Sequence, residues 1–515
     1  MSSISQRHAG QIVGSLSCFD RVVITGTLVD IGHAGAMAAT LTSRRFRLFD
    51  YTQFAEPLRD AIRANAERLA AESGLEIEYI QRRNFRKEDR VQEVLRSRDH
   101  AAGQRPSGTR GDPELVHIFS AMEPCSSFRP WHDKVTHQTV LKSREAKCLH
   151  YYFYFLDDDL GLCYLRVPTW APFRLQFYFN GHNALARQLA RRKIAHTLLD
   201  NAFVQIDDWA AAQKIVDEFD VKKLHRKLDR LARLFCPVVQ QFRGGVHWSL
   251  MQVEYATDIV FRTREALAPL YDGLVRTSIH AVKAENVATF LGRKLDGRFV
   301  GEIGNDFHTR IEGTRIRHHM GPAAIKMYDK HGRVLRIETT ANKVDFFKHH
   351  RTVEHRDGTE EKKVAPLRKT IYSLGVLAEL LGAANRRYLE FLAALDQPDA
   401  GVREVEKVAE PVRDNDRSFR GFNLFRNDDL VLFQAIVKGE FTISGLRNRD
   451  LRERLGKSGG QVSRVLKCLR LHGLIKKIGR TYKYYLTRLG QAVTACALRL
   501  RDEIVLPTLG APICA

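Results

Sequence analysis

The chain lacks the features that mark several common classes of protein. Its eight cysteines are scattered and never form a Cys-X-X-Cys pair, which argues against a zinc finger or zinc ribbon. No run of about 18 apolar residues occurs, so no membrane-spanning helix is expected. The first residues, MSSISQRHAG, contain no apolar signal core. Together these absences predict a cytoplasmic protein that does not bind membranes.

Acidic residues are too few to balance the basic ones. The 515 residues include 82 Lys and Arg against 60 Asp and Glu, which gives a formal net charge of +22. Basic surfaces bind polyanions because binding releases condensed counterions. With 44% hydrophobic residues, the chain can still form globular cores. The chain is longer than a domain with a single hydrophobic core usually is, so roughly two to four domains are expected.

The order of expected strands and helices predicts a multidomain α+β protein. Residues 1–145 alternate strands and helices, as is typical of an α/β domain. Residues 146–400 combine hairpin patterns with long helices and predict a central domain around a mixed β-sheet. Residues 401–424 are charged and contain proline, as linkers often do. Residues 425–515 would form a C-terminal winged helix-turn-helix domain.

An aromatic run at residues 148–168 predicts a β-hairpin. Strand alternation would place Phe153 and Phe155 on one face and Tyr152 and Tyr154 on the other. Such rings could stack nucleobases. The commoner arrangement is a core in which helices cover both faces of the sheet.

Two further central segments carry specific expectations. Residues 247–261 favour a helix, on which Glu254 and Asp258 would share a face and could hold a divalent metal. A solvated face is the commoner explanation of that spacing. Residues 346–364 predict a hairpin that turns at an Asp-Gly pair. Its strands are too polar for a core and would form an arm that contacts a partner.

Two isolated residues stand at the ends of expected strands. Asp20 begins one strand and could be a nuclease carboxylate, although no partner for it is evident. His182 follows another strand, at a place where α/β proteins often bind ligands. A helix cap is the commoner explanation for His182.

Residues 427–490 follow the order helix, helix, helix, hairpin, and are strongly basic. This order resembles a MarR-like winged helix-turn-helix. Apolar positions of the third helix would face the core and leave its polar side chains for a major groove, while the hairpin would contact phosphates or a minor groove. A winged helix that binds protein is the alternative, and a homodimer is a further expectation. The side chains expected to contact DNA are Gln461, Ser463, Arg464, Lys467, Lys477, Arg480 and Lys483.

The densest cluster of reactive side chains lies in the segment RIEGTRIRHHMGPAAIKMYDKHGRVLRIE. Its second half predicts two strands that pair as an antiparallel hairpin. Strand alternation places Tyr328 on the same face as Lys326 and Lys330, away from the apolar residues. Antiparallel pairing would bring Arg336 and Glu338 close to this tyrosine.

This set of side chains suggests chemistry on a phosphodiester. A tyrosine is a weak nucleophile at neutral pH because its pKa is near 10, so the attack needs nearby cations or a metal. Lys326, Lys330 and Arg336 would supply cations, and Lys326 would contact DNA. Carboxylates and imidazoles accept Mg²⁺ or Mn²⁺, the expected cofactors. The candidate ligands are Glu312, Glu338 and one of the adjacent histidines His318 and His319, with His318 preferred.

The runs T-R-I-R-H-H-M-G, I-K-M-Y-D-K and V-L-R-I-E-T resemble the replication-initiation factors of rolling-circle plasmids and related phages. In that family a tyrosine of this region nicks one DNA strand and stays joined to the 5′ phosphate, with the help of a metal. The resemblance implies that Tyr328 is the nucleophile and Glu338 a metal-site or general-base carboxylate. It implies that Arg336 and Lys330 contact phosphates. The His-hydrophobe-His metal motif of the wider nickase superfamily does not occur.

The leading hypothesis is therefore a DNA-binding protein of a mobile element or replicon that nicks and joins a DNA strand, single-stranded or duplex, through Tyr328. The alternative is a non-catalytic regulator that binds DNA or structured RNA. The whole chain also resembles bacterial proteins of similar length that are described as MarR-type regulators, a resemblance that brings no established activity.

Overall fold

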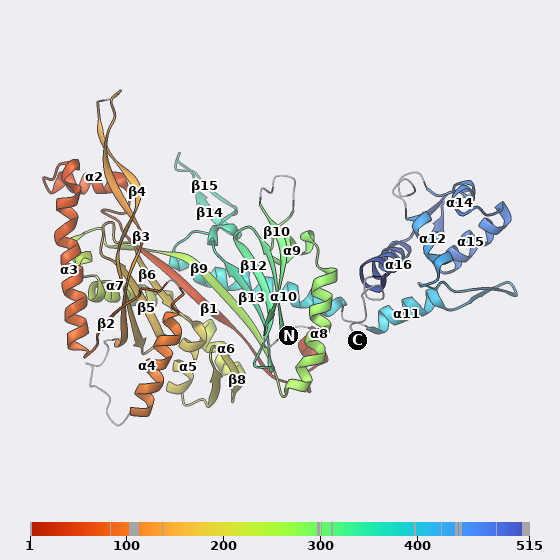
Figure 1. The fold of residues 1–515 in the computed structure, drawn as a ribbon, viewed down its shortest axis with the longest axis horizontal. Coiled ribbons are helices and arrows are strands. Elements are labelled where there is room, and N and C mark those ends of the chain that lie inside the picture. The colour runs from red at the N-terminus through yellow and green to blue at the C-terminus, as the bar shows by residue number, and fades with distance from the viewer. Residues whose placement is uncertain are drawn as a thin grey trace. The chain divides into compact units, whose positions relative to one another are not determined.

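The computed structural model shows a mixed α+β protein (Figure 1). It describes residues 3–82, 84–101, 113–135, 137–295, 299, 301–310, 313–395, 398–423, 425–437, 441, 445–479 and 481–506. The chain divides into two compact units, Met1–Asp396 and Gln397–Ala515. None of the described helices combines the length and the apolar character that crossing a membrane requires.

One large sheet organises the first unit, and eleven of its strands lie among the described residues. The pair β2–β3 is parallel, and the other described neighbours in the sheet are antiparallel. The strands, in spatial order, are β10 (Ile303–Arg310), β11 (Gly313–Met320), β12 (Ala323–Lys330), β13 (Val334–Ala341), β9 (Val246–Phe261), β1 (Ile12–Leu28), β6 (Leu175–Phe179), β5 (Gly161–Pro168), β4 (Thr139–Asp157), β3 (Glu114–His132) and β2 (Ile77–Tyr79).

The sheet joins the two regions that the sequence assigned to separate domains. β1, from the start of the chain, pairs with β9 on one side and with β6 on the other. The expected boundary between residues 145 and 146 falls inside β4, whose neighbours are β3 and β5. The N-terminal α/β region and the central region therefore share one sheet and one core.

Residues 246–261 form the strand β9, and the helix expected at 247–261 is wrong. Strand β9 lies in the middle of the sheet between β1 and β13, and much of it is buried on both faces. Such strands lose the clean alternation that identifies a strand in a sequence. Glu254 and Asp258 share a face in the strand as well, because they are an even number of residues apart.

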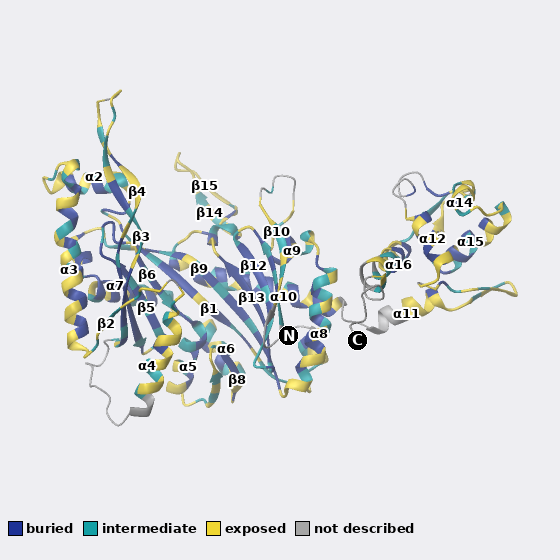
Figure 2. Cartoon of the chain, in the orientation of Figure 1, coloured by how far each residue is buried: buried dark blue, intermediate teal, exposed yellow. Residues whose placement is uncertain are grey.

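Helices cover both faces of the sheet. On the face that carries Phe153 and Phe155, both rings stack on Phe235 of α7 (Val221–Phe235). On the opposite face, Tyr152 and Tyr154 belong to a smaller core with residues of α4 (Lys87–Ala101). All four of these strand side chains are buried, so they are core residues and do not form an open stacking platform. Figure 2 shows buried positions along the strands of the sheet.

The same two faces continue toward β13. Asn385 of α10 (Leu374–Leu395) donates to the Thr257 hydroxyl at 3.1 Å and accepts from Thr339 at 2.6 Å. On the other face, α5 (Gly181–Arg191) brings His182 within 3.3 Å of Asp258. We call these the α10 face and the α5 face of the sheet.

A separate two-stranded hairpin follows β13, as the sequence predicts. Its strands are β14 (Lys348–Glu354) and β15 (Glu360–Pro366). Most of its side chains are exposed, and Gly358 in its turn has a φ of 82°, which favours glycine.

The described part of the second unit consists of short helices and two small hairpins. Its described elements are α11 (Pro398–Ala409), β16 (Val412–Asp414), β17 (Arg417–Phe419), α12 (Asn427–Ile436), α14 (Asn448–Leu455), α15 (Gly459–Leu471), β18 (Ile475–Lys477), β19 (Tyr484–Leu486) and α16 (Arg488–Arg499). The expected linker at 401–424 contains most of α11 and the β16–β17 hairpin. Ser458 caps α15 in a capping box with Gln461.

We expect Ile337→Ala to destabilise the first unit. Ile337 of β13 is fully buried in the main core, so its truncation loses apolar burial and leaves a cavity. The expected cost is about 2–5 kcal/mol, measured by urea unfolding. The control is Val364→Ala on β15, which is 53% exposed and should change the stability by less than about 0.5 kcal/mol.

Candidate functional site

A cluster of charged and polar side chains lies on the α5 face of the central strands. We call it the central charged cluster. Four neighbouring strands and α5 contribute its members, which are Asp20, His182, Glu254, Asp258, Lys326, Tyr328, Lys330, Arg336 and Glu338.

Strand register places most of these side chains together. Along β12 and β13, Lys326 lies opposite Glu338 and Tyr328 lies opposite Arg336. On the other side of β13, Arg336 lies opposite Asp258 of β9. The register of β1 against β9 shifts between Phe19 and Arg21, which marks a β-bulge at Asp20. Bulges re-aim side chains, and this one turns Asp20 toward the cluster.

Arg336 is the centre of the cluster and is fully buried. Its Nε and Nη2 donate to the two carboxylate oxygens of Asp258, each at 2.6 Å, and its Nη1 lies 3.2 Å from Asp20. Its Nη2 also lies 2.6 Å from the Asn201 carbonyl oxygen and 2.9 Å from His182 Nε2. Burial alone would raise the pKa of Asp258, but Arg336 and His182 lower it to about 2.

Tyr328, Glu338 and Lys326 form a second group beside Arg336. The Tyr328 hydroxyl donates to Glu338 Oε2 at 2.6 Å, and Lys326 Nζ donates to Oε1 of the same carboxylate at 2.6 Å. Burial raises the pKa of Glu338 even though Lys326 opposes that shift. Burial and the neighbouring Glu338 also raise the pKa of Tyr328 well above its usual value. A carboxylate with a raised pKa is a better proton acceptor for the phenol.

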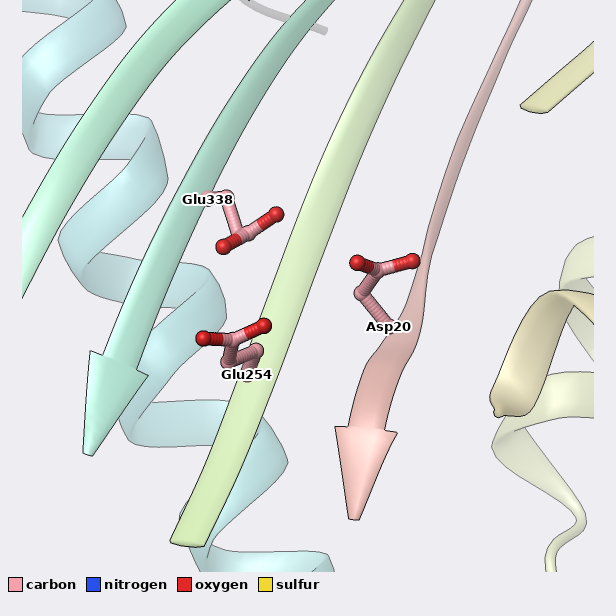
Figure 3. Close-up of side chains that lie close together, drawn as sticks. All are labelled: Asp20, Glu254 and Glu338. Atoms are coloured by element: carbon pink, nitrogen blue, oxygen red, sulfur yellow. The ribbon is translucent and has the colours of Figure 1, made fainter. Parts of the chain in front are cut away.

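Glu338 also belongs to a group of three carboxylates with Asp20 and Glu254 (Figure 3). One oxygen from each lies within 4.8 Å of the others, and the three side chains come from β13, β1 and β9. Lys326 Nζ lies 3.2 Å from Glu254 and 2.6 Å from Glu338, so its ammonium group balances part of the negative charge. Oxygen ligands of this kind suit Mg²⁺ or Mn²⁺.

The ligand set expected from the sequence does not come together in this way. Glu312 lies outside the described residues. His318 lies on the α10 face, where its Nε2 is 2.9 Å from the Tyr388 hydroxyl and its Nδ1 is 2.6 Å from Asn305 Oδ1. Burial lowers the pKa of His318 to about 4, and the sheet separates its ring from Glu338. The reason is strand alternation, which sends His318 and His319 to opposite faces.

Lys330, expected as a phosphate contact, points toward a hairpin that covers one end of the cluster. This hairpin consists of β7 (His196–Leu199) and β8 (Ala202–Ile206). Lys330 Nζ donates to Asn201 Oδ1, and Asn201 Nδ2 donates to Asp20 at 2.6 Å. Burial and Arg336 lower the pKa of Lys330. Arg336 is likewise engaged by Asp258 and is not exposed to a phosphate.

The sequence predicts Glu254 and Asp258 as a possible metal-binding pair but gives no partner for Asp20, and a helix cap is the commoner explanation of His182. These four side chains come together because β1 pairs with β9 and α5 packs on the same face of the sheet. The pairing of β1 with β9 brings Asp20 close to Glu254, although more than 230 positions separate them in the sequence. No local pattern in the sequence carries that information.

In the second unit, the side chains expected to contact DNA have different environments. Gln461, Ser463 and Arg464 are exposed along α15, and Lys477 is exposed on β18. Lys467 forms an ion pair with Asp414 of β16 at 2.7 Å and is therefore engaged within the protein. Two further positions are Lys483, which is half-buried, and Arg480, which lies outside the described residues.

No protein-family model matches this chain, and a search of curated proteins finds no match. The chemistry of the site therefore has to be inferred from its own residues.

We expect Asp258→Ala to destabilise the first unit by about 3–5 kcal/mol, because it leaves the Arg336 guanidinium buried with much of its charge uncompensated. Urea unfolding at pH 7 measures this. The control is Asp158→Ala, whose carboxylate is 78% exposed and 3.7 Å from Arg191, and which should cost about 0–1 kcal/mol. Equal costs for the two variants would contradict a structural role for the Arg336–Asp258 pair.

Proposed function

We propose that this protein cleaves and rejoins a DNA strand with Tyr328 as the nucleophile. One observation carries the proposal: the Tyr328 hydroxyl lies 2.6 Å from Glu338, which belongs to the carboxylate group with Asp20 and Glu254. Tyr328 as nucleophile and Glu338 as proton acceptor thus lie next to each other, and Glu338 is also one of the three candidate metal ligands. The resemblance of this segment to rolling-circle initiation factors agrees with the proposal.

The proposed reaction exchanges one phosphodiester for another. The Tyr328 oxygen attacks the phosphorus while its proton passes to Glu338. The bond from phosphorus to the 3′ oxygen breaks, and that oxygen takes a proton from water. The products are a tyrosyl 5′-phosphodiester and a free 3′ hydroxyl. In the reverse reaction the 3′ hydroxyl attacks the phosphorus and gives its proton to solvent, and the Tyr328 oxygen leaves and recovers the proton held by Glu338.

The transition state gathers negative charge next to three carboxylates, so cations are needed there. Lys326 supplies one cation of the protein itself, because its ammonium group contacts both Glu338 and Glu254. Mg²⁺ or Mn²⁺ held by Asp20, Glu254 and Glu338 would supply further charge stabilisation. Arg336 holds Asp20 and Asp258 in place and so acts as a positioning residue.

We further propose that the second unit is a winged helix-turn-helix that locates the DNA site. Helices α14 and α15 would form the helix-turn-helix, and the β18–β19 hairpin would be the wing. The exposed polar side chains of α15 support this assignment. A cytoplasmic protein of a mobile element or replicon would combine both activities.

A non-catalytic regulator that binds DNA or structured RNA is the second candidate. This candidate is favoured by the ion pairs within the central charged cluster, in which Lys326 already pairs with Glu338 and Arg336 with Asp258. Tyr328 would then be a structural hydrogen-bond donor.

Incubation with DNA and Mn²⁺ should give a covalent protein–DNA adduct that survives denaturing electrophoresis. Single-stranded and supercoiled DNA from the flanks of the gene are the substrates. Tyr328→Phe should abolish the adduct, and Glu338→Gln should slow its formation by about 10²–10⁴-fold because the proton acceptor is lost.

The matched control for this experiment is Tyr79→Phe. Tyr79 of β2 is 48% exposed and lies far along the sheet order from β12, so its adduct yield should equal that of the wild type. If the wild type forms neither adduct nor nick with either DNA, the protein is not a tyrosine nickase and the regulator proposal is preferred.

Arg464→Ala in α15 should weaken binding to duplex DNA without changing the fold, because the side chain is exposed. If Arg464 contacts one phosphate, the slope of log K against log salt should become shallower by about 0.9. If Arg464 contacts a base edge, the free-energy difference between binding the correct and a wrong base pair should fall by about 1–3 kcal/mol. Fluorescence anisotropy over a salt series separates the two. Unchanged binding of Arg464→Ala would contradict the proposed role of α15. The control is Arg187→Ala on α5, which should bind DNA as the wild type does.

A further inference from the structure

The β3–β4 hairpin extends well beyond the body of the sheet. Strand β5 pairs with β4 only from His150 onward, whereas β3 and β4 continue to pair with each other up to His132 and Thr139. Residues 124–132 and 139–147 therefore form a two-stranded ribbon at one end of the sheet, and its projection is visible in Figure 1. We call this ribbon the β3–β4 arm.

The two faces of the arm differ. On one face, Phe128 and Leu141 are buried in the main core, and the Phe128 ring lies 6.0 Å from that of Tyr51. Near the base of the arm, this face therefore packs on the main core of the first unit. Because side chains alternate along each strand, the residues between these positions lie on the opposite, outer face.

The outer face is cationic. Arg129 lies directly opposite Lys142, and Arg144 lies two residues further along the same strand as Lys142, on the same face. The three basic side chains are exposed, and within the described part of the chain no ion pair joins them to a carboxylate. Like charges directly opposite each other in a sheet are destabilising. The arm thus maintains an unfavourable charge arrangement that a polyanion would relieve.

One aromatic ring completes the outer face. Trp131 lies opposite Val140, and the Lys142 ammonium group is 3.2 Å from the centre of the Trp131 ring. This cation–π contact covers the ring, so the ring is not free to stack a nucleobase. A partner therefore has to be recognised mainly through its charge and its shape.

We propose that the outer face of the β3–β4 arm lies in a groove of duplex DNA and contacts the phosphates through Arg129, Lys142 and Arg144. A two-stranded ribbon has the width that a major groove admits, about 12 Å. Single strands are usually held by exposed aromatic platforms, and the arm offers none. The inference rests on the proposed DNA-binding function and assigns the first unit its own contact with duplex DNA.

The test compares two full-length variants that each lose three positive charges. The arm variant is Arg129→Gln, Lys142→Gln and Arg144→Gln. The control variant carries Lys193→Gln, Lys222→Gln and Arg226→Gln, at exposed positions next to α5 and on α7. Binding to a fluorescent duplex and to one of its single strands is measured over a series of salt concentrations.

For the arm variant on duplex DNA, we expect the slope of log K against log salt to fall by about 2.7, which corresponds to three lost phosphate contacts. The control should retain the slope of the wild type. Equal slopes for the two variants overturn the proposal, as does a loss seen only with single-stranded DNA. Failure of the wild type to bind either DNA would instead overturn the proposed function, because the arm would have no ligand to test. Circular dichroism confirms that both variants are folded.

Discussion

The arrangement of the central strands depends on the hydrogen bonds and ion pairs that hold the buried guanidinium group of Arg336. A buried charge is costly unless it is paired and fully hydrogen-bonded. Here Asp258 takes two hydrogen bonds, Asp20 lies at 3.2 Å, and a backbone carbonyl takes another. Each of these partners comes from a different part of the chain. The requirement to satisfy one arginine therefore fixes the register of β13 on β9 and the position of the bulge in β1.

The same arrangement sets the electrostatics of Tyr328 and Glu338. Their pKa values are raised because the covering elements exclude water from this part of the sheet. A tyrosine with a raised pKa is less reactive until a cation approaches. These shifts keep the phenol protonated at rest, and in the proposed reaction Glu338 would receive its proton.

Local patterns in the sequence were sufficient for some of these features. The hairpin of β12 and β13 and the shared face of Lys326 and Tyr328 follow from strand alternation and turn residues, and the register places Glu338 opposite Lys326 as expected. The helix expected at residues 247–261 is wrong, because a strand buried on both faces shows apolar residues at spacings that a helix also produces. The roles of Asp20 and Asp258 depend on pairing between distant strands, and periodicity within a single segment contains no information about such pairing.

The place of β1 in the sheet order has a consequence for how the chain is made. β1 leaves the ribosome well before β9, the strand with which it makes its longest pairing and which begins at Val246. At typical synthesis rates of about 5–20 residues per second, β1 waits roughly 10–50 s for that partner. Until then, the edge of β1 that pairs with β9 presents unpaired backbone groups. A chaperone that binds nascent chains would therefore find its natural target in residues 12–28.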